Sequence, residues 1–580
     1  MRSRFKAVGE RLLPTPVRER RAEQRRIAKA EEAERKRAER IAQRRQALLE
    51  SDSALREIVV DGRTFYGRVV DGSTAADTSA RNLNLVADAL EQAGIGYFLV
   101  PGHSSTRHVL GVRLADRKRF LESLRELYRG TAFYAATPSR EGLPAESVLY
   151  ADGALPTAVK RSDTIRFGEI LLGPAGQVLA DLDFGCDVEF WRDGSKLLES
   201  EGGPARIAKL RTQAPPDVLA DALVAPRRNA VSDVLPAAAQ KTAVLRVRGR
   251  DVPTFAEFLQ PRIDAVDFPI DVVYTWVDGS DPELRAKREF YRTGAPPRIS
   301  ARETGASRYT SHDELKYSLR SLEMYAEFIR HVYVVTDGQT PSWLNLDAPG
   351  ITVVDHKEIF SDPDALPVFN SHAIGTQLHH IPGLSEHYLY FNDDVFVGRP
   401  MTPQQFFHGN GIARLPFSPF QFGLGEPHPE EPAPNSAGKN VRQLLLESNG
   451  RFITNKFMHT PHPQIRSVMR ELEERFAADI DRTSRSRFRS TTDIAMGASL
   501  HHHYAHLTGR AVPGTFRFRY VDIGQEDAQE RLAELERTHR FDFFCLNDVD
   551  VPAEAQERVT ARLHTFLESY FPYPSAFERT

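Results

Sequence analysis

The sequence predicts an α/β protein whose C-terminal part, residues 266–580, is built on a parallel, doubly wound sheet. Apolar runs typical of buried parallel strands lie at residues 268–277, 331–336, 351–355 and 388–397. Helical patterns separate these runs, as the crossovers of a parallel sheet require. Acidic residues follow several of the runs, and ligands of open α/β sheets bind where strands end. The acidic strand ends therefore predict a binding site.

Composition limits the class of protein. The chain has 580 residues, with 41% hydrophobic and 27% charged residues, which indicates a soluble protein of several domains. Its two cysteines, Cys186 and Cys545, are too few for a disulfide framework and favour a reducing compartment. No apolar stretch is long enough to span a membrane, and the N-terminus lacks the apolar core of a secretory signal. We expect a cytoplasmic protein.

Residues 1–50 form a basic arm. They contain 16 Lys and Arg against 8 Asp and Glu, although the whole chain has a net charge of −3. The Ala, Arg and Glu content of residues 17–50 predicts one exposed helix or a short coiled coil. Such an arm can hold a protein at the inner face of a membrane or on an assembly machinery, and we expect no nucleic acid as its partner. The alternative interpretation is a solvated helical tail.

A separate accessory α/β domain is predicted for residues 51–200, beginning with a β-hairpin around Asp61-Gly62. Within it, Asp187 and Glu189 occupy alternate positions of one strand, so they share a face as a two-metal site would need. A structural polar face is the favoured interpretation. The Ala, Pro and Arg content of residues 201–265 predicts a linker.

Within residues 266–580, the part after the sheet is predicted to be mostly helical, with helices at 463–478, 492–507 and 553–571. Residues 408–450 are rich in Pro and Gly and predict a loop insertion that acts as a lid, binds the acceptor or is disordered.

Paired carboxylates give a second chemical signal. Asp393 and Asp394 lie inside the apolar run Tyr388–Val397, where burial is costly unless a cation or hydrogen-bond donors compensate the charge. Alternation along a strand would turn only one of them toward an ion. Carboxylate oxygens are hard ligands, which favours Mg²⁺ or Mn²⁺ and an anionic substrate such as a diphosphate.

Four ordered blocks of the sequence carry a family resemblance. They are residues 270–281 (IDVVYTWVDGSD), residues 307–394 ending in Asn392-Asp393-Asp394, residues 459–490 beginning His459-Thr-Pro-His462, and Cys545-Leu-Asn-Asp548. Together they resemble the Stealth family of sugar-phosphate transferases, which includes bacterial capsular polysaccharide hexose-1-phosphotransferases and the lysosomal-enzyme N-acetylglucosamine-1-phosphotransferase. The resemblance implies a Rossmann-like, GT-A-related catalytic domain. It also implies transfer of a hexose 1-phosphate from a UDP-sugar donor to a polysaccharide acceptor, with release of UMP.

The resemblance also implies roles for individual residues. Asp271, Asp394, His459 and Arg489 are the expected catalytic residues, with His459 and Arg489 beside the phosphates. The expected metal-binding residues are Asp393, Asp394, Asn547 and Asp548. Trp276, Asp278, Arg320, Asp337 and His462 are the expected substrate-binding residues. The chain departs from many relatives at Gly375, where they carry Glu, and at Ser311, where they often carry Asp.

Two alternative functions remain open at this stage. One is an ordinary GT-A-type glycosyltransferase that releases UDP. The other is a non-catalytic nucleotide-sugar-binding protein, which the glycine at position 375 makes conceivable. The general base is also open, between Asp271, Asp394 and His459.

Overall fold

The computed structural model describes residues 15–102, 104–138, 147–292, 309, 311–548, 551 and 553–579. Residues 1–14 of the predicted arm lie outside this range. The chain divides into two compact units, each with its own core. Unit 1 comprises Met1–Val70 and Thr78–Leu259, and unit 2 comprises Asp71–Asp77 and Gln260–Thr580.

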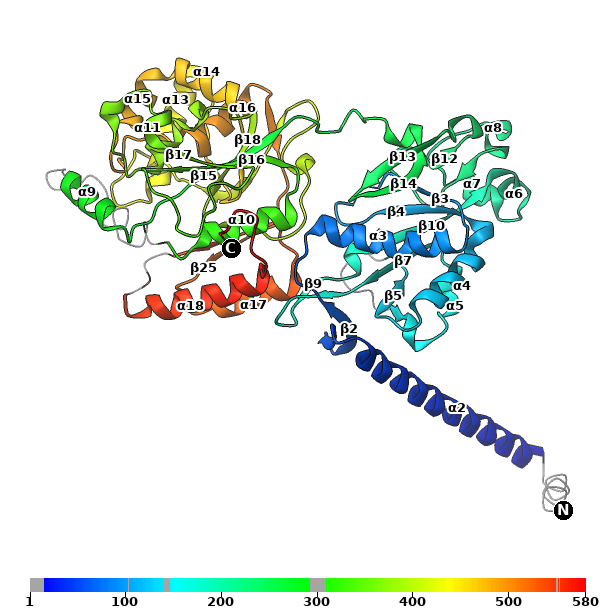
Figure 1. The fold of residues 1–580 in the computed structure, drawn as a ribbon. Coiled ribbons are helices and arrows are strands. Elements are labelled where there is room, and N and C mark those ends of the chain that lie inside the picture. The colour runs from blue at the N-terminus through cyan, green and yellow to red at the C-terminus, as the bar shows by residue number, and fades with distance from the viewer. Residues whose placement is uncertain are drawn as a thin grey trace. The chain divides into compact units, whose positions relative to one another are not determined.

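The arm of unit 1 is a single long helix, α2, Thr15–Ser51. Its side chains between Ala22 and Arg40 are exposed, which agrees with the predicted solvated helix, and only its last turns contact the rest of unit 1 (Figure 1). There Leu48 is 3% exposed within an apolar cluster, and Arg45 binds the Asp152 carboxylate at 2.8 and 2.7 Å. The last ten residues of the arm are therefore part of the folded unit.

Unit 1 is a mixed α/β domain. The predicted hairpin around Asp61-Gly62 is present as β1, Leu55–Val60, and β2, Arg63–Val69, which pair with β8, Leu171–Leu172, and β9, Val178–Ala180. A larger sheet has the order β12-β11-β10-β7-β5-β6, with β4 beside β10 and β3 beside β4. Its strands are β3 Tyr97–Leu99, β4 Val109–Arg113, β5 Phe133–Ala136, β6 Val148–Leu149, β7 Thr164–Glu169, β10 Cys186–Asp193, β11 Leu223–Val224 and β12 Val234–Leu235. The helices α3, Ala75–Gln92, and α4, Arg117–Tyr128, contribute buried apolar side chains to its core.

The predicted linker over 201–265 is wrong for most of its length. Strands β11 and β12 extend the large sheet from β10 by antiparallel pairing, and β13, Thr242–Val247, pairs with β14, Arg250–Phe255. Phe255 and Phe258 pack with the buried Trp191 in one apolar cluster. A few large apolar side chains therefore fix a segment whose Ala, Pro and Arg content is typical of a linker.

The carboxylates of Asp187 and Glu189 serve a structural role in unit 1. Arg166 Nε donates to Asp187 at 2.8 Å, and Arg227 donates to both carboxylates at 2.8 and 2.7 Å. Trp191 Nε1 also donates to Glu189 at 3.1 Å. Buried charges paired in this way need no metal ion, so the structure favours the polar-face interpretation of this strand.

Unit 2 contains the predicted parallel, doubly wound sheet. Its order is β17-β16-β15-β18-β23, and the four strands β15 Ile270–Thr275, β16 Ile329–Thr336, β17 Ile351–Asp355 and β18 His387–Asn392 run parallel. β23, His462–Ile465, adds an antiparallel edge. The chain order along the sheet reverses between β15 and β18, which is the switch point where open α/β sheets bind ligands.

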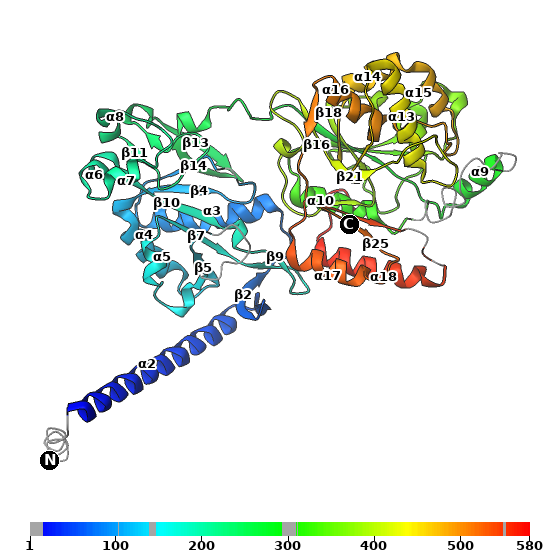
Figure 2. The same cartoon turned by 180° about the vertical axis from the view of Figure 1, so that it is seen from behind.

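Both faces of this sheet are buried. Val272 and Tyr274 belong to one apolar cluster, and Val273 between them belongs to another, as strand alternation requires. On one side of the sheet lie α10, Glu314–Tyr325, with α17, Ala528–Thr538, and α18, Ala553–Tyr570. On the other lie α11, His356–Ile359, and α14, Arg466–Arg475, in both views (Figures 1 and 2).

The run 388–397 forms two strands instead of the single predicted strand. β18 ends at Asn392, the chain turns at Asp393-Asp394, and β19, Val395–Val397, joins a second sheet of order β19-β26-β25. In this sheet β26 is Phe543–Asn547 and β25 is Phe518–Asp522. The second sheet brings β26, a distant part of the chain, to the end of β18. Like β18, β26 ends in an acidic sequence.

The remaining elements correct the predicted loop insertion at 408–450. This segment contains β20, Ala413–Leu415, β21, Phe417–Gln421, and the helix α13, Ala433–Asn449, whose Val441 and Leu445 are buried. Only part of it is therefore loop. The other elements of unit 2 are α9 Pro282–Arg292, α12 Ser371–Gly375, η9 Leu378–His380, β22 Asn455–Phe457, α15 Ala477–Ser484, the π-helix Met496–His501, α16 His502–Leu507 and β24 Ala511–Pro513.

No helix among the described residues is long and apolar enough to cross a membrane.

Candidate active site

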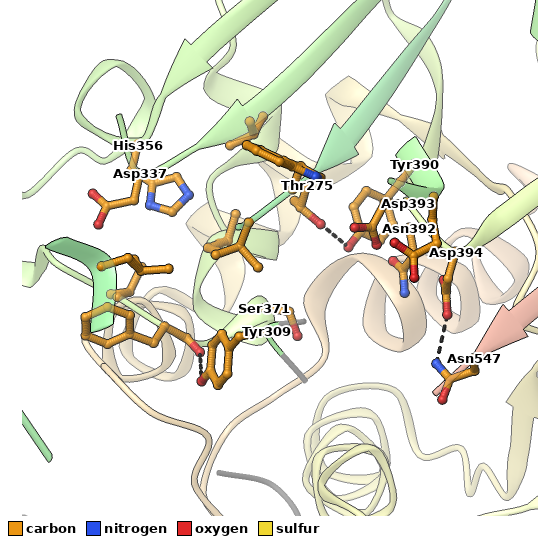
Figure 3. A pocket seen from close by; sticks show the side chains of 18 of the residues that line it. Thr275, Tyr309, Asp337, His356, Ser371, Tyr390, Asn392, Asp393, Asp394 and Asn547 are labelled. Carbon is orange, nitrogen blue, oxygen red and sulfur yellow. Dashed lines mark hydrogen bonds between the residues drawn. The ribbon is translucent and has the colours of Figure 1, made fainter. Parts of the chain in front are cut away.

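A pocket of about 260 Å³ lies at the switch point of the unit 2 sheet. Thr275 and Trp276 reach it from the end of β15, and Asn392, Asp393 and Asp394 from the end of β18 (Figure 3). The end of β26 adds Asn547 and Asp548. Three strand ends from two sheets therefore meet in one cavity, as the acidic strand ends predicted.

Hydrogen-bond donors surround the Asp394 carboxylate. Asn547 Nδ2 donates to its Oδ2 at 2.8 Å, and the Cys545 thiol donates to the same oxygen at 3.3 Å. The other oxygen, Oδ1, lies 3.2 Å from His459 Nε2, which is also 3.0 Å from the Asn392 amide. The side chain of Asp394 is only 14% exposed. Burial opposes its ionisation, but the charge of His459 and these donors outweigh burial and lower the pKa of Asp394, which is therefore ionised at neutral pH.

Asp393 has the opposite electrostatic environment. Burial, followed by the neighbouring Glu314 and Asp394 carboxylates, holds the pKa of Asp393 well above its usual value. Burial likewise raises the pKa of Glu314, whose carboxylate accepts a hydrogen bond from the His312 backbone N–H at 2.6 Å. These acidic groups lie close together, and a bound cation would compensate the charge of their ionised forms.

Asp548 closes this acidic group on the side of α18. Its carboxylate lies 3.4 Å from His312 Nε2 and accepts hydrogen bonds from the Val551 N–H at 3.1 Å and the Gln556 side chain at 3.2 Å. Burial opposes ionisation of Asp548, but the hydrogen bond from His312 and the other two donors lower its pKa. Asp548 is therefore an anion that faces the same pocket as Asp393.

A cationic side chain faces the same pocket. Arg489 lines it, and its guanidinium donates to the Ser371 hydroxyl at 2.8 Å at the start of α12. The hydroxyls of Thr275 and Tyr390 lie 3.0 Å apart beside it. An arginine fork beside hydroxyl groups is a common arrangement for phosphate oxygens.

Asp337 and His356 form the far end of the pocket (Figure 3). Asp337 and His356 lie together there, away from Asp394 and Asn547 (Figure 3). Asp337 forms an ion pair with Lys287 of α9. Burial lowers the pKa of His356 to about 4, so this ring is neutral at physiological pH. This end is therefore less charged than the end that holds Asp393 and Asp394.

Five predicted site residues do not line the pocket. Asp271 lies near the amino end of β15, four residues before the pocket edge, or about 13 Å along the strand. Its buried carboxylate binds Arg330 at 2.8 and 2.6 Å and accepts from the Ser385 N–H at 2.7 Å. The prediction of a catalytic role for Asp271 therefore does not agree with its position.

Arg320 also has a structural environment. It lies on α10 beyond Glu314 and binds both oxygens of the Glu578 carboxylate at 2.7 Å, with a third bond to the Phe571 carbonyl at 3.0 Å. Helix α10 therefore presents its first residue to the pocket and Arg320 to the C-terminal segment.

Among the other three, His459 contacts the pocket residue Asp394 without lining the pocket itself. The remaining two are His462 and Asp278. His462 is buried at the start of β23, with Nδ1 2.9 Å from His502 Nε2, and burial lowers its pKa to about 3. Asp278 accepts hydrogen bonds from the backbone and hydroxyl of Ser280 in the turn before α9. Neither is in a position to contact a substrate in this pocket.

The donor set of the pocket fits a divalent cation. It offers carboxylates from Glu314, Asp393, Asp394 and Asp548 and an amide oxygen from Asn547. Hard oxygen ligands of this kind suit Mg²⁺ or Mn²⁺. Asp393 is buried beside the Glu314 and Asp394 carboxylates, which raises its pKa, and a bound cation would compensate this crowding of acidic groups. Asp394, His459 and Cys545 also place possible ligand atoms within 4.8 Å of one another.

Sequence reasoning missed several pocket residues. Glu314 has the position of a helix-capping residue in the sequence, and its place beside Asp393 depends on the packing of α10 against β19. Tyr390, Ser371 and His356 are ordinary strand, loop and helix residues in sequence. A substitution of Glu by Gly at position 375 leaves open space, since a Cβ there would meet nothing within 4 Å.

The fold is α/β, with an acidic pocket at the strand ends as the candidate active site. The chain belongs to the Stealth family. Its residues 268–295, 308–415, 458–506 and 534–580 match the models of Stealth protein conserved regions 1, 2, 3 and 4. The chain is accordingly a transferase, of the phosphotransferase class.

Curated relatives extend the similarity beyond these regions. An exopolysaccharide phosphotransferase of Streptomyces coelicolor is 43% identical over 498 residues, which is 86% of this chain and 82% of that protein. The exopolysaccharide phosphotransferase CpsY of Mycobacterium tuberculosis is 34% identical over 90% of this chain and 92% of its own. Since residues 268–580 are little more than half of the chain, both matches include much of unit 1.

Among solved structures, the galactosyltransferase LgtC, in complex with donor and acceptor sugar analogues, covers 51% of this chain and 95% of its own. The sequence identity is 12% and the TM-score 0.26.

Proposed function

We propose that the protein transfers a hexose 1-phosphate from a UDP-sugar to a hydroxyl group of a polysaccharide acceptor, forming a phosphodiester and releasing UMP, in the synthesis of a capsule or exopolysaccharide. The observation that carries the proposal is one pocket that is lined by Asp394, the other acidic side chains and Arg489, with His459 in contact with Asp394. The names of the curated relatives support the polysaccharide acceptor.

The reaction exchanges one P–O bond for another. The acceptor oxygen attacks the phosphorus that bears the sugar, and the bond from that phosphorus to the bridging oxygen breaks. UMP leaves with the bridging oxygen, and the acceptor proton passes to a base. Charge grows on the departing phosphate, so binding and charge neutralisation supply most of the catalysis. Arg489 is placed to hold the phosphoryl oxygens in this step.

His459 is the base that this geometry favours. Its Nε2 lies 3.2 Å from Asp394 Oδ1, the arrangement in which a carboxylate orients an imidazole for proton transfer. The second oxygen of Asp394 accepts a hydrogen bond from Asn547, so the two oxygens have different partners. Asp271, an alternative base in sequence terms, is occupied by Arg330 away from the pocket.

Asp393, Asp394, Asn547 and Asp548, with Glu314, would hold Mg²⁺ or Mn²⁺. When bound, the ion would neutralise charge on the diphosphate. Trp276 and Asp337, which line the pocket, would contact the nucleoside or sugar of the donor. Trp276 offers a flat aromatic surface and Asp337 a hydrogen-bond acceptor for hydroxyl groups.

The released nucleotide tests the proposal. Purified protein is incubated with a panel of UDP-sugars and a polysaccharide acceptor, with Mg²⁺, with Mn²⁺ and with EDTA. We expect UMP, formed in equal amount to the phosphodiester, with either ion and none in EDTA. UDP as the product would replace the proposal by glycosyl transfer, and full activity in EDTA would refute the metal role.

The exposed basic face of α2 supports a location for this chemistry. Twelve Lys and Arg side chains lie between Thr15 and Ser51, most of them exposed. We propose that the protein works in the cytoplasm and that α2 holds it at the anionic inner face of the membrane or on an assembly machinery. A growing polysaccharide acceptor would then be within reach.

A further inference from the structure

A second cluster of potential ligands lies in unit 2, away from the pocket. His379 and His380, at the end of η9, face Glu473 of α14, and one ligand atom from each lies within 4.8 Å of the others. None of the three side chains lines the acidic pocket. The cluster is therefore independent of the site to which the proposed function refers.

Both imidazoles converge on one carboxylate oxygen. His379 Nε2 lies 2.8 Å and His380 Nε2 3.0 Å from Oε2 of Glu473. The two rings come from adjacent residues, and their centroids are 4.1 Å apart. Two imidazole nitrogens and one carboxylate oxygen are a common ligand set for zinc, which then keeps a water molecule in its fourth position.

The second ring nitrogen of His380 supports a cation in this place. Nδ1 lies 2.9 Å from the Ile359 carbonyl oxygen, and a carbonyl can only accept, so Nδ1 carries the proton. In a neutral ring, Nε2 then presents its lone pair to the Glu473 carboxylate, and two acceptors face each other. A cation or an additional proton between them removes this repulsion. Histidines that bind metals usually donate their other N–H to a carbonyl or carboxylate, as His380 does.

The surrounding structure holds the three side chains in position. Arg466 and Glu473 lie seven residues apart on α14, hence two turns apart on one face. Arg466 donates to the carbonyls of His379 at 2.8 Å, Ile381 at 3.2 Å and Leu384 at 2.7 Å. The helix that carries Glu473 therefore anchors the backbone that carries both histidines, and the guanidinium is directed at carbonyl oxygens.

The cluster is closed on one side and open on the other. The side chain of His379 is fully buried, whereas those of His380 and Glu473 are 24% and 32% exposed. An ion can therefore enter from solvent, and water can complete its coordination.

We propose that His379, His380 and Glu473 bind a zinc-type divalent ion that joins the η9 segment to α14 and stabilises unit 2. Nitrogen-rich ligation distinguishes this site from the oxygen-rich pocket, which suits Mg²⁺ or Mn²⁺. The ion has a structural role and takes no part in phosphoryl transfer.

Zinc titration of the full chain tests this site directly. Protein stripped with EDTA and dialysed is titrated with Zn²⁺ by calorimetry, and bound metal is counted by mass spectrometry after gel filtration. We expect Glu473→Gln and His380→Gln to bind one zinc ion fewer than the wild type. The wild type should also show a higher Tm with zinc, and both variants should lose that increase. His331→Gln, at a histidine of β16 outside both sites, is the matched control and should behave as the wild type.

The difference in bound zinc between the wild type and the variants does not include zinc held by Asp394, His459 and Cys545, because that cluster is unchanged in all variants. The proposal would be overturned if the wild type bound no zinc in the micromolar range, or if it bound no more zinc than Glu473→Gln. A proton shared between His380 and Glu473 would then explain their contact. If one of the two variants fails to fold, the other supplies the same comparison with the wild type. UMP release with Mg²⁺ is measured in parallel, and zinc removal should change Tm without changing this activity at a temperature well below Tm.

Discussion

Asp394 and Asn547 come from different sheets and meet in one hydrogen bond, with Nδ2 of Asn547 2.8 Å from Oδ2 of Asp394 (Figure 3). Asp394 follows β18 of the parallel sheet, and Asn547 ends β26 of the second sheet. The pairing of β19 with β26 brings them together across 153 residues of sequence. The active site therefore exists only when the second sheet is assembled.

Replacing Asn547 by alanine should lower kcat without unfolding the protein. The change removes a donor that holds the Asp394 carboxylate, and we expect a loss of about 10- to 100-fold, or about 1.4–2.7 kcal/mol. UMP release at saturating donor measures it. Asn410→Ala, in an exposed turn, is the control. Normal kcat in Asn547→Ala would show that Asp394 needs no such support.

Arg489→Lys tests the phosphate contact. Lysine keeps the charge but loses the guanidinium fork, so we expect at least a tenfold lower kcat/KM, about 1.4 kcal/mol. Arg482→Lys is a matched control from the same basic run, because Arg482 is partly exposed and pairs with Asp479. Equal rates for the two variants would place Arg489 outside the reaction.

Asp271→Asn should affect stability instead of catalysis. The Asp271 carboxylate is buried and binds the half-exposed Arg330 and the Ser385 N–H, and leaving buried hydrogen-bonding groups without a partner costs about 1–3 kcal/mol. We expect a lower urea midpoint, with kcat of the folded protein within about twofold of the wild type. A large loss of kcat at unchanged stability would return Asp271 to the catalytic residues.

The Arg320–Glu578 pair should make stability depend on pH in acid. Burial opposes ionisation of Glu578, but the Arg320 hydrogen bonds and charge outweigh it and lower the pKa of Glu578. A carboxyl with a lowered pKa adds stability above its unfolded value, about 4.3, and this contribution is lost as the pH falls through the folded pKa. Glu578→Gln should therefore be less stable than the wild type at pH 7, and the difference should shrink below about pH 4. Urea unfolding across this range measures it, and a difference that does not vary with pH would contradict the assignment.

Removal of the residues before Ile41 should separate tethering from turnover. Deletion to residue 50 would also remove Leu48 and Arg45, which contact the folded part of unit 1, so the shorter deletion is the cleaner experiment. We expect unchanged kcat on a soluble acceptor and weaker co-sedimentation with anionic vesicles, with a neutral vesicle as the control. Lost turnover, or unchanged vesicle binding, would contradict a tethering role for α2.

Sequence reasoning predicted that acidic strand ends meet in one place, as they do in the pocket, and failed where a residue's direction or partner mattered. Asp394 and Trp276 follow their strands and line the pocket, as predicted. Asp271 has the same chemistry and belongs to the same motif, yet it lies near the amino end of its strand and is bound by Arg330. Arg320 is similar, because Glu578 lies 258 residues away in sequence. Motif membership does not show which end of a strand, or which face of a helix, a side chain occupies.

By itself, the sequence determined the α/β class, the parallel sheet, the exposed basic helix and the four blocks that identify the Stealth family. These properties follow from periodicity, composition and local order, which are short-range features of the chain. Only the tertiary structure decided that the supposed linker belongs to unit 1, that residues 388–397 divide between two sheets, and that Glu314 faces Asp393. The physical reason is that burial, ion pairing and pKa depend on partners far away in sequence, and folding alone brings those partners into contact.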